Sequence, residues 1–367
     1  MKIIDRYVLS IFFSFFFGAI TLLVTLFTLI LFFELIADFI SSKAPLYLMA
    51  AYLLNKLPEA AYYMAPMAVL AASILSLSLM SKDREVMILM SCGISALRIT
   101  LPLIGGAMLI ATFAFLDSEY LMPHAWIKSE DIYRSDVKKM EGLGHIRQNM
   151  VWIKTGEDIW NIGYLDVKNG ILHDVNIMRF RPDKSGFASI ISARKGYRRG
   201  AQWTFEEGIE RRFTNGIGVE ESPFTARNYS FALDFKELKH AEKAPQEMNF
   251  REITSYIEHI KRAGYEDIRY SVDRYVKITF PLISVVMAII SIPFGLKTGR
   301  SVGAFSGIAI AVMIGFVFWF LFSMGVSLGH SGKLPPLAAA GGAHLVFLGA
   351  GVYAMLSGFH AREGIFR

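Results

Sequence analysis

Six apolar segments, each long enough to cross a bilayer as a helix, constrain this chain more than any other feature of its sequence. They lie at residues 8–33, 60–80, 99–118, 275–296, 302–328 and 335–357. A transmembrane helix needs about 20 predominantly apolar residues. The composition agrees, since 53% of the residues are hydrophobic and only 19% are charged. The sequence therefore predicts an α-helical integral membrane protein with six spans, three before and three after a long polar insertion.

The first two apolar segments raise questions about where their helices begin and end. The run from Tyr7 to Phe33 is longer than the core of a signal peptide and lacks a small-residue cleavage site, so we expect a retained first helix. A single helix from Leu46 to Met80 would be about 50 Å long, which exceeds the hydrocarbon core of a bilayer. Pro58 therefore predicts a helix break near the membrane surface.

Basic residues in the short loops predict the orientation, because cytoplasmic loops carry an excess of lysine and arginine. One side of the expected bundle carries Lys2, Arg6, Lys82, Arg84, Arg98, Lys297, Arg300, Arg362 and Arg367. We therefore expect both termini in the cytoplasm and the stretch of about 120–270 on the exported side. The same basic residues account for the net charge of +6, so no nucleic-acid partner is expected.

The exported stretch changes from apolar runs to alternation of apolar and polar residues. Examples are "VWIKTGEDIWNIGYLDV", "ILHDVNIMRF", "QWTFEEGIERRF" and "NYSFALDF", which are separated by turn signals such as Lys168-Asn169-Gly170 and Thr214-Asn215-Gly216. This pattern predicts an antiparallel, jelly-roll-like β domain. A helix follows, because Asn249 and Glu252 form a capping-box pattern before apolar residues at helical spacing. We expect an amphipathic helix beside the membrane, and the alternative is an ordinary helix packed on the β domain.

Several kinds of functional site are missing from the sequence. The first, second, third and fifth segments carry no charge at mid-depth, and His344 is the one ionisable residue deep in the sixth, which disfavours an ion-coupled carrier. There is no phosphate-binding GxxxxGK[ST] loop, no metal-ligand spacing and no GxSxG nucleophile motif. We therefore expect a non-catalytic chain that holds no cofactor or metal and works as part of a larger assembly.

Two local features indicate contact surfaces. Small residues recur at helical spacing in the fifth segment, at Gly303, Gly307, Ala311 and Gly315, where helices can approach closely. They predict either packing within the chain or a separable seam, that is, a lateral gate facing a partner. The loop at 81–98 places Asp83 and Glu85 at the start of a short amphipathic helix, where negative charge is favoured.

These pieces match a known family in their order. The matching stretches are "DRYV" at 5–8, "LPEAAYYMAPMAVLAASILSL" at 57–77, "REVMILMSCGIS" at 84–95 and "RYVKITFPLISVVMAIISIPFG" at 274–295. Over essentially its whole length the chain resembles the lipopolysaccharide export permeases of the LptF/LptG type. Its "DRYV", "KITFP" and, at 334–336, "LPP" stretches are more like the LptG member.

The resemblance implies a bacterial inner-membrane subunit that extracts lipopolysaccharide and passes it through a periplasmic jelly-roll domain to a bridge of similar domains. It implies a homologous LptF-type permease as partner, a cytoplasmic ABC ATPase dimer that binds the ATP and Mg, and a single-helix membrane component. In that family the acidic residue that begins the coupling helix docks into a groove of the ATPase, and Glu85 corresponds to it. The expected ATPase-coupling residues are Asp83, Arg84, Glu85, Val86, Met87, Leu89 and Met90.

The expected domains are spans one to three at 1–119, the jelly-roll domain at 120–248, the amphipathic helix at 249–272 and spans four to six at 273–367. Candidate residues of the substrate cavity are Phe27, Phe32, Lys43 and Phe316. A second hypothesis is a scaffold that relays the motion of an ATPase to exported partners without conducting lipid. A third, an enzyme that acts on periplasmic lipid, is disfavoured because no acid–base pair lies in a plausible pocket.

Overall fold

The computed structural model describes residues 3–133, 137, 151–155, 158–166, 170–181, 186–199, 202–213, 219–231, 245–262, 267–298 and 304–363. The chain divides into two compact units. The helical unit comprises Met1–Ala37, Leu53–Lys128 and Pro245–Arg367, and the β unit comprises Asp38–Tyr52 and Ser129–Ala244.

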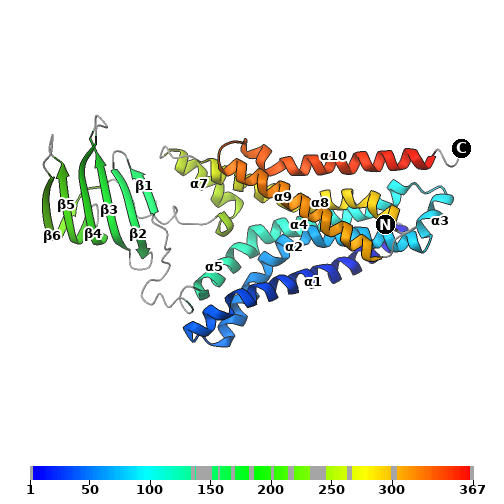
Figure 1. Ribbon diagram of the computed structural model, residues 1–367, viewed down its shortest axis with the longest axis horizontal. Coiled ribbons are helices and arrows are strands. Elements are labelled where there is room, and N and C mark those ends of the chain that lie inside the picture. The colour runs from blue at the N-terminus through cyan, green and yellow to red at the C-terminus, as the bar shows by residue number, and fades with distance from the viewer. Residues whose placement is uncertain are drawn as a thin grey trace. The chain divides into compact units, whose positions relative to one another are not determined.

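Six helices of the described chain are long and apolar enough to cross a membrane, which confirms the six predicted spans. They are α1 (Ile3–Ser42), α2 (Leu46–Lys82), α4 (Ala96–Leu116), which continues through a π-helical turn (Asp117–Leu121) into α5 (Met122–Ile132), α8 (Ile268–Thr298), α9 (Ala304–His330) and α10 (Pro336–Glu363). The short helix α3 (Glu85–Ser91) joins α2 to α4. Figure 1 shows α8, α9 and α10 running side by side.

The helix break predicted at Pro58 is wrong, because α2 runs unbroken from Leu46 to Lys82 with Pro58 and Pro66 inside it. The prediction assumed that a helix must end where the bilayer ends. Instead, the first turns of α2 pack against the end of α1, where the rings of Phe39 and Tyr52 lie 6.1 Å apart. Tyr133, just beyond α5, donates a hydrogen bond of 2.6 Å to Asp38. These helix ends support one another, so α1 and α2 extend farther than a span requires.

The third span also runs past its predicted end. Residues 120–132, which the sequence analysis gave to the β domain, continue the helix through α5, and the first described strand begins only at Val151. A π-helical turn inserts one extra residue in a helix and is often found at functional sites. Here it lies at Asp117–Leu121, where the predicted span was expected to end.

The core of the helical unit lies around α2 and α8, which are the most buried spans of the described chain. One cluster joins both helices to the beginning of α1 and to α4, and it includes Phe12 and Leu103. A second joins both to α9 and α10, and it includes Phe280 and Phe318. His344 of α10 lies in this second region, and its Nε2 atom is 2.8 Å from the carbonyl oxygen of Thr279 in α8. This histidine is a hydrogen-bonded packing residue.

The predicted amphipathic helix is present as α7 (Phe250–Arg262), preceded by a 3-10 turn (Pro245–Glu247). Its capping box is formed as expected, with Asn249 and Glu252 exchanging hydrogen bonds of 2.8 and 3.1 Å. The carboxylate of Glu119, in the π-helical turn, accepts a bond of 2.9 Å from the amide of Phe250. The apolar face of α7, including Ile253 and Ile257, packs together with Tyr270 of α8. The helix α7 is therefore held by the π-helical turn at its first residue and by α8 along its apolar face.

The inserted β domain is confirmed as one antiparallel sheet, in which each described strand pairs with the next along the sequence (Figure 1). The strands are β1 (Val151–Thr155), β2 (Asp158–Asp166), β3 (Ile171–Phe180), β4 (Phe187–Arg199), β5 (Gln202–Phe213) and β6 (Val219–Tyr229). Asp174 and Glu207 have positive φ angles of 50° and 51°. No pair is formed at either residue, but the register is the same on both sides of each, so the strands are locally distorted there without an inserted residue. Leu172 and Val175, which flank the distortion in β3, are both buried.

The buried face of the sheet is strongly aromatic. Trp160 of β2 and both Trp203 and Phe205 of β5 are fully buried. Phe231 follows the last strand, yet its ring lies 4.9 Å from that of Trp160. The sheet must therefore be curved enough for the residue after β6 to contact β2, and these aromatic side chains form the core of the β unit.

One charged side chain, Glu210 of β5, is buried within this sheet and is 4% exposed. Its carboxylate accepts hydrogen bonds from Arg212 at 2.8 Å, from Arg227 at 2.7 Å and from the hydroxyl of Tyr229 at 2.9 Å. Burial opposes ionisation of Glu210, but the bonds from Arg212, Tyr229 and Arg227 outweigh it and lower the pKa of this carboxyl.

Candidate functional site

The loop at 81–98 folds as a sharp turn, the two-turn helix α3 and a second turn. Arg84 has a φ of 61°, a left-handed conformation that side chains rarely adopt, and it reverses the chain after α2. Gly93, with a φ of 82°, ends α3, and its amide donates to the carbonyl of Met90 at 3.0 Å. Ser95 then caps α4 by accepting a bond from the amide of Arg98 at 3.2 Å. The loop therefore has a defined backbone conformation that is held by hydrogen bonds at both ends of α3.

Two polar contacts tie this loop to the beginning of α1. The hydroxyl of Tyr7 donates a hydrogen bond of 2.8 Å to Oε1 of Glu85. The guanidinium of Arg98 contacts both carboxylate oxygens of Asp5, at 2.7 and 3.0 Å. Both distances to Asp5 involve the same nitrogen of Arg98, Nη2. The bond between Tyr7 and Glu85 thus joins α3 to α1, and the ion pair of Asp5 and Arg98 joins the first turn of α4 to α1.

The predicted coupling residues divide into an exposed and an inward-facing set. Asp83, Arg84 and Met87 are exposed, and Glu85 is half-buried. The expectation that Val86, Leu89 and Met90 offer an apolar docking surface is not met, because Val86 is buried and the other two pack on the core. Ile88, which the sequence analysis did not select, is 60% exposed. At 100° per residue, the outward apolar face of α3 is formed by Met87 and Ile88.

The small residues of α9 are used for packing within the chain, which is the alternative that the sequence left open. Gly307, Ala311 and Gly315 are buried. A Cβ atom on Gly315 would lie 2.1 Å from Cε of Met67 in α2, and one on Gly307 would lie 3.1 Å from Ile74 of α2. Gly303 lies outside the described residues. The expected partner seam therefore cannot consist of these residues as they are placed here.

The opposite face of α9 is apolar and exposed. Its residues repeat every four positions, at Ile308, Val312, Phe316, Phe320 and Met324. Phe316, one of the predicted cavity residues, is 71% exposed on this stripe. A continuous apolar stripe on a transmembrane helix faces either lipid or another helix. This face, and not the glycine face, is the one available to a partner or a lipid.

The remaining predicted cavity residues are not brought together. Phe27 and Phe32 are half-buried along the second half of α1. Lys43 is exposed in the turn between α1 and α2 and has a φ of 58°. None of the four candidates lines the cleft between α1, α2 and α4.

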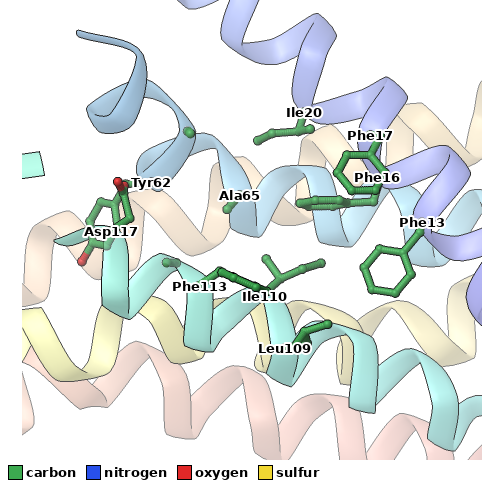
Figure 2. A pocket seen from close by; sticks show the side chains of 12 residues that line it. Phe13, Phe16, Phe17, Ile20, Tyr62, Ala65, Leu109, Ile110, Phe113 and Asp117 are labelled. Carbon is green, nitrogen blue, oxygen red and sulfur yellow. The ribbon is translucent and has the colours of Figure 1, made fainter. Parts of the chain in front are cut away.

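That cleft lies between α1, α2 and α4 and has a volume of about 500 Å³. Its α1 wall consists of Phe13, Phe16, Phe17 and Ile20. Its other walls come from Ala61, Tyr62 and Ala65 of α2 and from Leu109, Ile110, Phe113 and Ala114 of α4. Figure 2 shows the phenylalanines of α1 toward one end and Tyr62 beside Asp117 at the other.

Asp117 is the only charged residue that lines this cleft among the residues that the structure describes. It begins the π-helical turn after α4, and its Oδ2 atom is buried without a hydrogen-bond partner in the described part of the chain. Asp117 was not among the predicted site residues, because it lies at the predicted end of the third span. Continuation of the helix to Ile132 places it within a membrane-spanning helix.

Comparisons with known proteins decide the family. Residues 6–357 match the sequence profile of the family described as lipopolysaccharide export system permease LptF/LptG. The chain belongs to the LptF/LptG family. It is 21% identical over 292 residues to the lipopolysaccharide export system permease protein LptG of Escherichia coli strain K12, with 79% of this chain and 80% of the relative covered. It is also 23% identical over 301 residues to an uncharacterised protein of Aquifex aeolicus, with 79% and 81% covered.

Membership of the LptF/LptG family confirms the resemblance drawn from the sequence, and it gives the chain a role in lipopolysaccharide export. The match spans both the six apolar helices and the inserted sheet. An LptF/LptG permease with these helices is an inner-membrane protein. The α3 loop, the exposed stripe of α9 and the cleft beside α1 are the candidate functional surfaces of the described chain.

Proposed function

We propose that this chain is the LptG-like permease subunit of an ATP-driven lipopolysaccharide exporter. It pairs with a homologous LptF-type permease and is driven by a separate cytoplasmic ABC ATPase dimer, which binds the ATP and Mg. The family match over residues 6–357 is the observation that carries this proposal. The contacts of α3 with α1 support it, because they supply a route by which a motion at the loop reaches a span.

In this proposal the ATPase binds the α3 loop at its exposed residues. These are Asp83, Arg84, Met87 and Ile88. Glu85 has a second role besides docking, since its carboxylate is bonded to Tyr7 and so joins the loop to α1. Closure of the ATPase dimer moves α3, and Asp5 with Arg98 carries the motion along the same helix. Both termini and the α3 loop lie in the cytoplasm, and the β unit lies in the periplasm.

Lipopolysaccharide enters between the two permeases, along the exposed faces of α1 and α9. The lipid then passes to the β unit, whose sheet has an aromatic core that includes Trp160, Trp203 and Phe205. From there the lipid continues to a bridge of similar domains, with a single-helix membrane protein as a further component.

The decisive experiment is charge reversal at the loop, with Glu85→Lys and Glu85→Ala in cells depleted of the native protein. The readouts are co-purification of the ATPase and delivery of lipopolysaccharide to the cell surface. We expect both variants to lose transport while the β unit stays folded. Glu220→Lys is the matched control, because Glu220 is an exposed acid on β6, far along the chain from α3. Normal transport in both Glu85 variants would contradict the coupling role.

A second experiment separates a conduit from a scaffold that only relays motion. Photocrosslinking residues are placed at Phe27 of α1 and Phe316 of α9 in the intact complex. Adducts with lipopolysaccharide at both positions support conduction between the permeases. A fully assembled, active complex that gives no adducts at either position would favour the relay.

A further inference from the structure

The cleft between α1, α2 and α4 is suited to hydrocarbon. Apart from the Tyr62 hydroxyl and the Asp117 carboxylate, its described lining consists of aliphatic and aromatic side chains (Figure 2). Apolar cavities of protein interiors stay dry and accept apolar guests, even when they are considerably smaller than about 500 Å³. Within a membrane-spanning region the abundant apolar guest is an acyl chain.

The wall formed by α1 gives such a chain a way in. Of the six candidate spans in the described chain, α1 is the least buried. Phe17 lines the cleft, yet its side chain is 62% exposed, so it lies at the rim. A lipid can therefore reach the cleft from the bilayer past α1 without crossing the core around α2 and α8.

The polar end of the cleft lies at the depth of a lipid headgroup. From Ala96 to Asp117, and from Lys82 back to Tyr62, each helix rises by roughly 30 Å, the thickness of the hydrocarbon core. Since both helices start at the α3 loop, Asp117 and Tyr62 reach the opposite membrane surface. A chain that fills the cleft from that surface runs toward Phe13 and Phe16 at mid-depth.

Asp117 determines which headgroup fits. Its buried Oδ2 atom makes no hydrogen bond within the described chain, and no lysine or arginine is among the described side chains that line the cleft. A buried carboxylate oxygen without a donor is costly, and the headgroup of a lipid in the cleft can supply one. A carboxylate attracts an ammonium group while it repels a phosphate.

We propose that this cleft retains one membrane phospholipid with a primary-amine headgroup, its acyl chain between α1, α2 and α4 and its ammonium group donating to Asp117. The lipid is a resident component that fills the space beside α1. This inference goes beyond the proposed export function and does not depend on it. Phosphate-rich glycolipids are disfavoured here because they would bring negative charge to Asp117.

The test measures retained lipid on the full-length chain. The protein is reconstituted in vesicles of equal parts phosphatidylethanolamine and phosphatidylglycerol, extracted in mild detergent, and its bound lipids are quantified by mass spectrometry. We expect wild-type protein to retain phosphatidylethanolamine in preference to phosphatidylglycerol. Asp117→Asn is expected to lower that preference by about tenfold, the loss of one charge-assisted hydrogen bond, while the total bound lipid stays the same.

Filling the cleft tests the position of the acyl chain. Ala61 lines the cleft and is half-buried, so Ala61→Leu adds bulk there and is expected to lower the total bound lipid by about one molecule per chain. Ala50→Leu is the matched control, since Ala50 is an exposed alanine on the same helix. It is expected to change nothing.

A crosslinking measurement on unaltered protein keeps the proposal testable if a variant does not fold. Photoactivatable phosphatidylethanolamine is expected to label α1 or α4 peptides of the cleft more strongly than the phosphatidylglycerol analogue. Equal retention of the two lipids by wild-type protein, an unchanged preference in Asp117→Asn, or full retention in Ala61→Leu would each overturn the proposal.

Discussion

Glu210 in the sheet and Asp117 in the helical unit are both acidic residues with buried carboxylate oxygens, but their partners differ. Glu210 accepts bonds from Arg212, Arg227 and Tyr229. Asp117 keeps one buried oxygen without a partner in the described chain. The sheet thus offsets the desolvation cost of its buried carboxylate with hydrogen bonds from its own side chains, whereas the described helices leave one carboxylate oxygen without a donor.

This difference predicts a structural role for Glu210 and a binding role for Asp117. A buried charge that is fully hydrogen-bonded by its own chain fixes the surrounding strands and leaves nothing for a ligand. A buried carboxylate with an unmade bond weakens its own fold until something else supplies the donor. Glu210 should therefore matter for stability, and Asp117 should matter for what the helices bind.

The largest effect is expected from Glu210→Gln. The amide replaces an acceptor oxygen with an NH₂ group that faces guanidinium donors, so the variant should destabilise β5 and β6 by about 3 kcal/mol. Hydrogen exchange of the full-length chain measures the loss as faster exchange of amides in these strands. Glu34→Gln, at an exposed acid on α1, is the control and should leave exchange in these strands unchanged. Equal protection in Glu210→Gln and wild type would remove the structural half of the comparison.

Acidification should reproduce that effect in the unaltered protein. The pKa of Glu210 is lowered by folding, so the stability it contributes is fully present above the ordinary carboxyl value of 4.5 and is lost as the pH falls through the lower folded value. Exchange in β5 and β6 should accelerate over that range. The acceleration should be smaller in Glu210→Gln, and an identical pH profile in both proteins would assign the acid effect to other groups.

The next largest loss of stability is expected from a substitution at a close contact between two helices, α9 and α10. A Cβ atom on Gly329 of α9 would lie 2.4 Å from the Cβ of Ala339 in α10, and neither atom can move independently of its backbone. Gly329→Ala should cost about 2 kcal/mol through overpacking. Gly341→Ala is matched, since nothing lies within 4 Å of its Cβ position. Thermal unfolding in detergent should separate the two variants.

A smaller change is expected from Tyr7→Phe, which removes one exposed hydrogen bond to Glu85 and leaves the carboxylate in place. Stability should fall by about 1 kcal/mol or less. Transport should fall more clearly than stability if the bond joins α3 to α1, because the loop then moves without the span. Tyr47→Phe, an exposed tyrosine on α2, serves as the control. Normal transport in Tyr7→Phe would mean that Asp5 and Arg98 suffice for the connection.

Much of the fold could be predicted because it depends on local pattern. Apolar length gave the six spans, alternation gave β1, β2, β3 and β5, and Asn249 with Glu252 gave the start of α7. The strand β4 was not predicted, and β6 ends at Tyr229, near the beginning of the predicted "NYSFALDF" stretch. The errors came from tertiary support. Pro58 lies inside α2 because the ends of α1 and α2 pack together, and the third span continues to Ile132 through a π-helical turn. Neither the packing of these helix ends nor the π-helical turn produces a periodic pattern in the sequence.

The functional surfaces were harder to predict because helix faces are set by neighbours. The glycine pattern of α9 correctly indicated close packing, but only the structure shows that Met67 and Ile74 of α2 fill that side. The same ambiguity hid Ile88, which is outward on α3 while Val86 is inward. The role of Glu85 came from resemblance to a family, whereas its bond to Tyr7 joins residues 78 positions apart.

The smallest stability effect is expected from Asp117→Asn. A small effect is expected because, unlike Glu210, Asp117 has a buried oxygen that makes no hydrogen bond within the described chain. Asparagine has nearly the same shape and carries no charge, so an unbonded carboxylate is exchanged for a group that costs less to bury. In detergent without phosphatidylethanolamine, the variant should unfold at the same temperature as wild type or slightly higher. With the lipid added, wild type should gain stability in proportion to its binding and the variant should gain less. A clear loss of stability without lipid would show that Asp117 already has a partner in the folded chain, and the distinction between the two carboxylates would then disappear.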